Sequence, residues 1–146
     1  MKRNGYTLIE LMLVLVLITL ILGLTAVYFA GSLTKAKLNA TGRELAALMR
    51  YARTSARMNM EVKAVTIDLD GRTYSLADRA TKEIPANISI RLIDPVDGPV
   101  DRGKHLFLFH PNGKIEGGKI LLSSKAKKLS IDIDPVTGVV LLKSSL

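Results

Sequence analysis

One acidic residue lies inside a long apolar segment near the start of the 146-residue chain. Between Tyr6 and Gly31 nearly every position is apolar, and Glu10 is the only charged residue. A carboxylate within a membrane costs roughly 3 kcal/mol on insertion scales, so such a residue usually has a function and a partner that neutralises it. We therefore interpret Glu10 as a charge-pairing residue. The alternative is that Glu10 only sits at the level of the lipid headgroups.

Histidine and aspartate pairs elsewhere give little support for catalysis or metal binding. His105 and His110 are five residues apart, so on one strand their side chains point to opposite faces. The chain also has no cysteine that could complete a set of metal ligands. Alternating aspartates place two carboxylates on one strand face, as acid-base chemistry would need. These pairs are Asp68 with Asp70 and Asp132 with Asp134. Solvated polar positions of half-buried strands explain them better.

An aspartate-rich loop offers hard oxygen atoms that could bind calcium. It contains Asp94, Asp97 and Asp101 with Gly98 and Gly103, but it matches no defined calcium-loop spacing. The chain also lacks a glycine-rich phosphate loop and a nucleophile elbow. The sequence therefore predicts a protein that is not an enzyme, with no catalytic residue, no metal, no cofactor and no small-molecule substrate.

The element that positions Glu10 is a predicted membrane span. The 20 residues from Leu11 to Ala30 contain no charge, and at about 1.5 Å per residue they extend roughly 30 Å, the thickness of the hydrocarbon core. A secretory signal peptide has a shorter apolar region, of about 7 to 15 residues. Lys2 and Arg3 precede the run, so the positive-inside rule keeps this end cytoplasmic and exports the chain beyond Gly31. Without cysteine, the exported head must be held by an apolar core.

After the span, apolar residues continue to recur with the period of a helix. Apolar residues recur there at spacings of seven, four, three, four and four. They are Leu38, Leu45, Met49, Ala52, Ala56 and Met60. No proline precedes Pro85, which predicts a nearly continuous helix from Tyr6 to about Met60. Gly31 and Gly42 are expected to be the soft points of this helix, the positions where it deforms most easily.

Positive charge concentrates in the first part of the chain. Residues 1–60 hold eight Lys or Arg against two acidic residues, whereas residues 61–146 hold thirteen against eleven. Arg43, Arg50 and Arg57 recur every seven residues, and Arg53 lies beside them. We interpret this basic ridge as a solvated helix face, with subunit contacts as the alternative.

From Glu61 onward the hydrophobic period changes to two, which predicts strands. The expected strands cover residues 65–69, 73–76, 88–92, 106–109, 119–122, 129–133 and 139–142, and residues 106–109 are apolar on both faces. Turns are expected at residues 70–71, 112–113 and 137–138. The expected fold class is α+β. A long N-terminal helix crosses the membrane with its first half and packs with its C-terminal half against an antiparallel β-sheet head.

The junction before the apolar run carries a specific motif. Residues 5–11, GYTLIEL, follow a short basic leader and resemble the processing motif of type IV pilins and type II secretion pseudopilins. The resemblance implies that prepilin peptidase cuts between Gly5 and Tyr6 and methylates the new amino terminus on Tyr6, where phenylalanine is the usual residue. Glu10 then lies about one helical turn from Tyr6. The resemblance further implies that Glu10 directs subunit assembly by pairing with the terminal amine of a neighbouring subunit.

The second half of the chain resembles one branch of that family, the minor pseudopilins of the GspH/FimT type. The matching segments are residues 43–45 with 50–53, the hairpin that contains Tyr74, residues 109–113 with 117–118, and residues 133–138. The likeness extends over most of the chain. It implies a pilin-like fold and a minor subunit that lies near the filament tip or primes assembly.

The implied function is that of a minor pseudopilin of a type II secretion system, assembled into a periplasmic pseudopilus that drives export of folded proteins across the outer membrane. The implied partners are prepilin peptidase, other major and minor pseudopilins, the inner-membrane assembly platform and inner-membrane lipid. The implied divisions are a leader peptide at 1–5, a transmembrane helix at 6–31 and a periplasmic head at 32–146. The head comprises an amphipathic helix at 32–60 and a β-sheet region at 61–146. The resemblance implies a single-pass bacterial inner-membrane protein with a cytoplasmic N-terminus.

The alternative function is that of a minor type IV pilin of the FimT type, which binds DNA for natural transformation or primes pilus assembly. DNA-binding members of this branch use a basic carboxyl-terminal segment. In this chain, residues 137–143 contain a single basic residue, Lys143. The other dense basic cluster is Lys125, Lys127 and Lys128, and no aromatic side chain interleaves it for base stacking. DNA is therefore not an expected partner.

Overall fold

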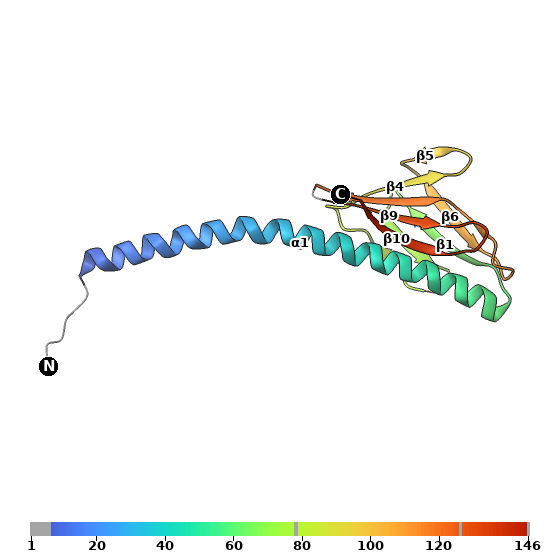
Figure 1. Ribbon diagram of the computed structural model, residues 1–146, viewed down its shortest axis with the longest axis horizontal. Coiled ribbons are helices and arrows are strands. Elements are labelled where there is room, and N and C mark those ends of the chain that lie inside the picture. The colour runs from blue at the N-terminus through green and yellow to red at the C-terminus, as the bar shows by residue number, and fades with distance from the viewer. Residues whose placement is uncertain (1–6, 78, 126, 146) are drawn as a thin grey trace. The chain divides into compact units, whose positions relative to one another are not determined.

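The structure is a computed structural model that describes residues 7–77, 79–125 and 127–145, with the side chains of 26–31 and 145 outside the description. The chain divides into two compact units, residues 1–33 and residues 34–146. Helix α1, Leu8–Asn59, contributes to both units (Figure 1). The described strands all belong to the second unit.

The first unit is the N-terminal part of α1, and its side chains are exposed from Leu8 to Thr25. Two hydroxyl groups within this apolar segment bond back to the helix. Thr19 Oγ1 donates to the carbonyl of Val16 (2.9 Å), and Thr25 Oγ1 donates to the carbonyl of Leu22 (2.9 Å). These bonds satisfy the hydroxyl groups without water, as a helix in lipid requires.

The second unit begins with the rest of α1, which buries most of the predicted apolar stripe. The fully buried members are Leu38, Leu45, Met49, Ala52 and Ala56. Met60, the last predicted member, is 75% exposed, so that part of the prediction was wrong. The helix ends at Asn59, and Met60 has a φ of 55°. A residue in this conformation leaves the helical path, so its side chain cannot continue the stripe.

The strands form two five-stranded antiparallel sheets, with orders β3-β2-β1-β6-β7 and β10-β9-β8-β4-β5. The strands of the first sheet are β1 (Lys63–Asp68), β2 (Thr73–Leu76), β3 (Lys82–Glu83), β6 (Lys104–Phe109) and β7 (Ile115–Glu116). Those of the second sheet are β4 (Ser89–Asp94), β5 (Gly98–Val100), β8 (Lys119–Ser124), β9 (Lys127–Ile133) and β10 (Val140–Ser145). Figure 1 shows the C-terminal part of α1 running along these sheets. The predicted α+β arrangement is confirmed, with the strands divided between two sheets.

Each of the seven predicted strands has a counterpart in the structure, whereas three short strands were not predicted. The missed strands β3, β5 and β7 contain two or three residues, too few to show a period. Residues 106–109 are apolar on both faces, but the strand buries one face more than the other. Phe107 and Phe109 are buried, but Leu106 is 58% exposed, because alternate residues of a strand point to opposite sides.

Each of the three predicted turns connects two successive strands: β1 to β2, β6 to β7, and β9 to β10. Gly113 and Gly138 have positive φ values, 91° and 68°, that glycine adopts without steric cost. In the first hairpin Asp68 pairs with Thr73, so residues 69–72 form the turn. Here Arg72, with a φ of 52°, takes the positive angle.

Gly42 allows α1 to lie close against the second sheet. A Cβ atom at this position would come within 2.9 Å of Leu129 Cδ1 and 3.5 Å of Leu142 Cδ1. The expectation that Gly42 is a soft point was wrong, because residue 42 is buried within continuous helix. The missing side chain serves packing against β9 and β10.

Polar contacts attach α1 to the first sheet as well. The buried Tyr74 of β2 donates its hydroxyl hydrogen to Glu44 Oε2 (3.1 Å), and Lys82 Nζ lies 3.3 Å from the same oxygen. Burial, together with the hydrogen bond to Glu44, raises the pKa of Tyr74 above its ordinary value. The phenol therefore stays protonated and remains a donor.

Candidate membrane and assembly site

The N-terminal end of α1 is capped by Thr7. Leu8 is the first helical residue, so Thr7 occupies the N-cap position. Its Oγ1 accepts the backbone N–H of Glu10 (3.3 Å), and its carbonyl accepts the N–H of Leu11 (3.2 Å). A threonine here satisfies one of the N–H groups that a helix leaves without an internal partner. The backbone of Glu10 is thereby fixed in the first turn.

The side chain of Glu10 is exposed, and within the described residues its carboxylate has no hydrogen-bond or ion-pair partner. The partial positive charge of a helix N-terminus favours a carboxylate by about 0.5 kcal/mol. That is small beside the cost of a charge in the bilayer, roughly 3 kcal/mol. The residues that the structure describes therefore leave Glu10 in need of a further partner.

Thr7 is a site residue that the sequence interpretation missed. The pattern Thr7-x-x-Glu10 is the capping-box signature, a threonine followed three residues later by glutamate, so the signal was readable. The structure contains the threonine half of this motif. Gly5 and Tyr6, the predicted cleavage and methylation residues, lie outside the described residues.

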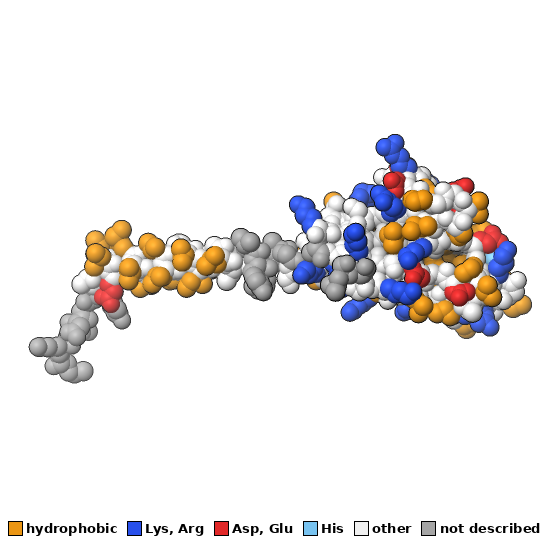
Figure 2. All heavy atoms as spheres, turned by 45° about the horizontal axis from the view of Figure 1, so that its top comes forward, with side chains coloured by type: hydrophobic (Ala, Val, Ile, Leu, Met, Phe, Trp, Pro, Cys, Tyr) orange, Lys and Arg blue, Asp and Glu red, His pale blue; other side chains and the backbone are white. Residues whose placement is uncertain are grey.

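Among the residues that the structure describes, one helical segment, Leu8–Thr25, is long and apolar enough to cross a membrane. None of its side chains is buried in the protein, unlike those of a core helix. Figure 2 shows apolar side chains covering this part of α1. The segment lies within the span predicted at residues 6–31.

The predicted basic ridge on α1 divides into two kinds of residue. Arg43 and Arg57 are exposed, as a solvated face requires. Arg50 and Arg53 instead donate from Nη2 to main-chain carbonyls, Arg50 to Val140 (3.1 Å) and Arg53 to Thr137 (2.7 Å). For these two the solvated-face interpretation was wrong, because they fasten the end of the chain to the helix.

Three of the aspartates considered for catalysis or calcium binding, Asp68, Asp94 and Asp134, accept backbone N–H groups in turns. The carboxylate of Asp68 accepts the N–H of Gly71 (2.7 Å), and that of Asp94 accepts the N–H groups of Val96 and Asp97 (2.8 and 3.1 Å). These bonds hold the pKa of Asp68 and of Asp94 below their ordinary values. Within the described ranges no three His, Asp or Glu side chains are grouped so as to hold a metal ion.

Asp134 and Asp132 are also bound locally. Asp134 Oδ1 accepts the N–H groups of Val136 and Thr137 (2.8 and 2.9 Å), which lowers the pKa of Asp134. Asp132 lies between Lys119 (3.0 Å) and Lys143 (2.8 Å). Partial burial raises the pKa of Asp132, but the hydrogen bonds from Lys143 and Lys119 outweigh burial and lower it overall. Lys143, the one lysine of residues 137–143, is therefore paired.

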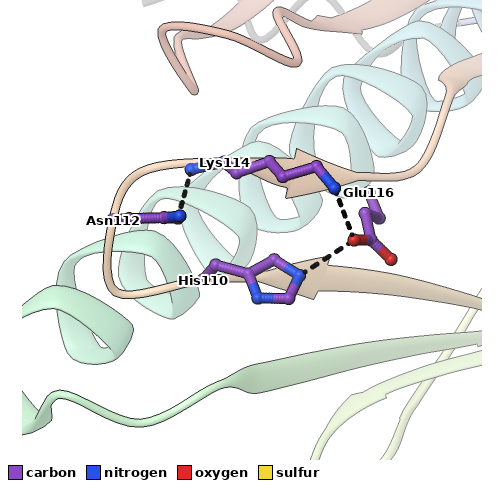
Figure 3. A network of polar contacts seen from close by, with 4 residues as sticks. All are labelled: His110, Asn112, Lys114 and Glu116. Atoms are coloured by element: carbon purple, nitrogen blue, oxygen red, sulfur yellow. Dashed lines mark hydrogen bonds and ion pairs between the residues drawn. The ribbon is translucent and has the colours of Figure 1, made fainter.

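The two histidines do not meet in the structure. His105 Nε2 lies 3.2 Å from the carbonyl of Arg102. His110 Nε2 lies 3.2 Å from Glu116 Oε1, an ion pair when the imidazole is protonated. Figure 3 shows this contact beside the hydrogen bond from Lys114 Nζ to the same oxygen (3.0 Å), which lowers the pKa of Glu116. This cluster joins the two ends of the β6–β7 turn.

The fold and the N-terminal segment together define a pilin-like protein. An exposed apolar helix carries a carboxylate in its first turn, and the head combines a helix with antiparallel sheets. Residues 1–26 match the family described as the prokaryotic N-terminal methylation motif.

Two known proteins resemble the chain over most of its length. Type II secretion system protein H of Xanthomonas campestris pv. campestris is 27% identical over 139 residues, which cover 95% of this chain and 82% of that protein. The minor pseudopilin EpsH from the type 2 secretion system of Vibrio cholerae shares the fold, with a TM-score of 0.58 and 10% identity over 74% of this chain and 97% of that chain. These comparisons confirm the resemblance to GspH-type minor pseudopilins.

Proposed function

We propose that the chain is a minor pseudopilin of a type II secretion system. The likeness to type II secretion system protein H over 95% of the chain carries this proposal, and the methylation motif at residues 1–26 supports it. In this role the subunit is stored in the bacterial inner membrane by one span, with its N-terminus in the cytoplasm and its head in the periplasm. It then joins a pseudopilus that drives export of folded proteins across the outer membrane. Its role is structural rather than catalytic.

The first step of the proposed function is removal of the leader peptide, residues 1–5. Prepilin peptidase cuts between Gly5 and Tyr6 and methylates the amino terminus of Tyr6. Lys2 and Arg3 keep the leader on the cytoplasmic side, where this cleavage occurs. The mature subunit then comprises the span, residues 6–31, and the head, residues 32–146.

The second step is assembly, in which the Glu10 carboxylate pairs with the terminal amine of a neighbouring pseudopilin delivered by the assembly platform. In a medium of low dielectric constant the two opposite charges attract strongly, and each offsets part of the desolvation cost of the other. Thr7 already holds the backbone N–H of Glu10. The carboxylate of Glu10 is exposed and has no partner among the described residues, so it is available for an intermolecular partner, and the pairing fixes the axial register of the subunit.

The test uses the full chain in a host that supplies prepilin peptidase, the assembly platform and the major pseudopilin. By intact mass, the unmodified chain and Glu10→Gln are expected to begin at Tyr6 with one added methyl group, whereas Gly5→Ala keeps Met1. By copurification with the major pseudopilin, Glu10→Gln is expected to incorporate roughly tenfold less or worse, because a buried charge loses its partner.

The matched control is Glu61→Gln, which removes an exposed carboxylate of the head and is expected to incorporate normally. Normal incorporation of Glu10→Gln would contradict the charge pairing. An uncleaved wild-type chain would contradict the pseudopilin function itself.

A further inference from the structure

The head carries a cluster of lysines at the end where its part of α1 begins. These five residues, which we call the basic collar, are Lys35, Lys37, Lys125, Lys127 and Lys128. Lys127 Nζ donates to Asn39 Oδ1 (3.1 Å), so the start of β9 lies against the helix one turn beyond Lys35. The other four side chains are exposed. Figure 2 shows basic side chains gathered at this end of the head.

Acidic residues are missing from both chain segments that meet at the basic collar. No Asp or Glu occurs between Glu10 and Glu44, or between Glu116 and Asp132. The basic collar therefore draws no compensating charge from its own segments.

Lysines elsewhere in the head are paired with carboxylates. Examples are Lys82 with Glu44 (3.3 Å), Lys114 with Glu116 (3.0 Å) and Lys143 with Asp132 (2.8 Å). The four exposed lysines of the basic collar have no ion-pair partner within the residues that the structure describes. Their charge is available to an external anion.

Chain connectivity places the basic collar at the membrane surface. Lys35 follows Ala30, the last residue of the predicted 20-residue span, by five positions. Five residues extend about 7 Å as helix and at most about 17 Å as extended chain, and the headgroup region is about 5 to 8 Å thick on each side of the bilayer. Lys35 and Lys37 therefore stay at or near the headgroups whatever orientation the head adopts. The bond to Asn39 brings Lys127 to the same end of the head.

We infer that the basic collar binds anionic phospholipid headgroups in the leaflet that faces the head. Ammonium groups are attracted to an anionic surface within a Debye length, about 8 Å at physiological salt. Nucleic acid fits less well, because no aromatic residue of the two segments interleaves the lysines for base stacking. Lysines that directly follow a span on its exported side also run against the positive-inside rule, which places basic residues on the cytoplasmic side. Binding to anionic lipid gives a reason for their presence there.

This lipid contact goes beyond the proposed assembly role and depends only on the membrane span. It holds the head at the bilayer surface while the subunit is stored. It must be broken when α1 leaves the bilayer, so it resists premature extraction.

The experiment measures which lipid lies beside the basic collar. The full chain has no cysteine, so Ala40→Cys, at an exposed position on α1, carries a single fluorophore. The chain is reconstituted in phosphatidylcholine vesicles with headgroup spin-labelled phosphatidylglycerol or phosphatidylcholine at equal mole fraction. We expect phosphatidylglycerol to quench about twofold or more strongly, and the preference to disappear at about 0.5 M salt.

Two charge-matched variants localise the effect. The collar variant carries Lys35→Gln, Lys37→Gln, Lys125→Gln and Lys128→Gln, and it keeps Lys127 because that residue bonds Asn39. The control variant carries Arg57→Gln, Arg102→Gln, Lys104→Gln and Lys114→Gln, all at exposed positions. The collar variant is expected to lose the lipid preference and the control to keep it. Should the fourfold collar variant fail to fold, the pair Lys35→Gln and Lys37→Gln must still reduce the preference.

Equal quenching by the two lipids, or a preference that survives in the collar variant, would overturn the inference. Salt-sensitive binding of a fluorescent DNA duplex together with equal lipid quenching would also overturn it and assign the lysines to nucleic acid. The measurement requires neither cleavage nor assembly. Its outcome is therefore independent of the pseudopilin proposal.

Discussion

The two parts of α1 differ in what surrounds their apolar side chains. From Leu8 to Thr25 every side chain is exposed, whereas the part in the second unit buries a stripe from Leu38 to Ala56 against the sheets. Both parts are helical, but the first is rich in leucine, whereas alanine outnumbers leucine in the second. Exposed apolar surface on this scale requires lipid or another helix, while the buried stripe contributes to the stability of the head itself. The same secondary structure therefore serves an intermolecular role in one part and an intramolecular role in the other.

The polar residues of the two parts differ in the same way. In the first part the hydroxyls of Thr19 and Thr25 bond to the helix backbone. In the second part Glu44, Arg50 and Arg53 bond to strands or to the turn between them. Removing a polar side chain should therefore affect the helix locally in one case and the tertiary structure of the head in the other.

The largest expected difference comes from truncating a leucine in each part. Leu45→Ala removes a fully buried side chain and should destabilise the head by about 2 to 5 kcal/mol. Leu15→Ala, at a position 55% exposed, should leave the head unchanged. Hydrogen exchange of the sheet amides in the full chain in mild detergent measures both. Equal effects of the two substitutions would refute the division of α1.

Replacing a glycine in each part of α1 should give a smaller difference in the stability of the head. Gly42→Leu forces atoms into the contact with Leu129, where a Cβ alone would come within 2.9 Å, and should cost the head about 1 to 3 kcal/mol. Gly23→Leu meets nothing within 4 Å and should leave head stability unchanged. Urea unfolding followed by circular dichroism compares the two variants. Wild-type stability of Gly42→Leu would show that α1 does not pack closely here.

The N-cap of the first part is expected to contribute about 1 kcal/mol. Thr7→Ala removes the acceptor of the Glu10 N–H, so the amides of the first turn should exchange faster. Thr7→Ser should retain slow exchange because its hydroxyl can accept the same hydrogen bond. Thr19→Ala is the control, since its hydroxyl bonds within the helix at Val16. Unchanged exchange at Glu10 in Thr7→Ala would argue against the cap.

The smallest expected effect is a pH dependence confined to the head. Two backbone N–H groups lower the pKa of Asp134, so its contribution to stability is present above the unfolded pKa, about 3.9, and is lost as pH falls through the folded value. Asp134→Asn should therefore show a shallower loss of stability below about pH 4. The control is Asp97→Asn, whose side chain accepts no backbone hydrogen bond among the described residues. Identical acid unfolding of Asp134→Asn and the unmodified chain would contradict this role.

Local pattern explains why much of the head was predictable. The spacing from Leu38 to Ala56 identified the buried face of α1, and glycines 113 and 138 identified turns that need positive φ. Two-residue strands such as β3 and β7 have no period to detect. The partners of Arg50 and Arg53 were also hidden, because the accepting carbonyls lie 90 and 84 residues further along the chain.

The amino-acid sequence was sufficient to predict the apolar N-terminal segment, the place of Glu10 within it and the apolar stripe of the second unit, because composition and spacing within a few residues govern these features. The capping of Glu10 by Thr7 was equally local and could have been read from the T-x-x-E pattern. Tertiary structure alone decided that Gly42 is a packing position and that Lys127 reaches Asn39. It also assigned the candidate catalytic aspartates to turns and lysine pairs. These outcomes depend on which distant segments meet, and that depends on burial of the whole core rather than on any local pattern.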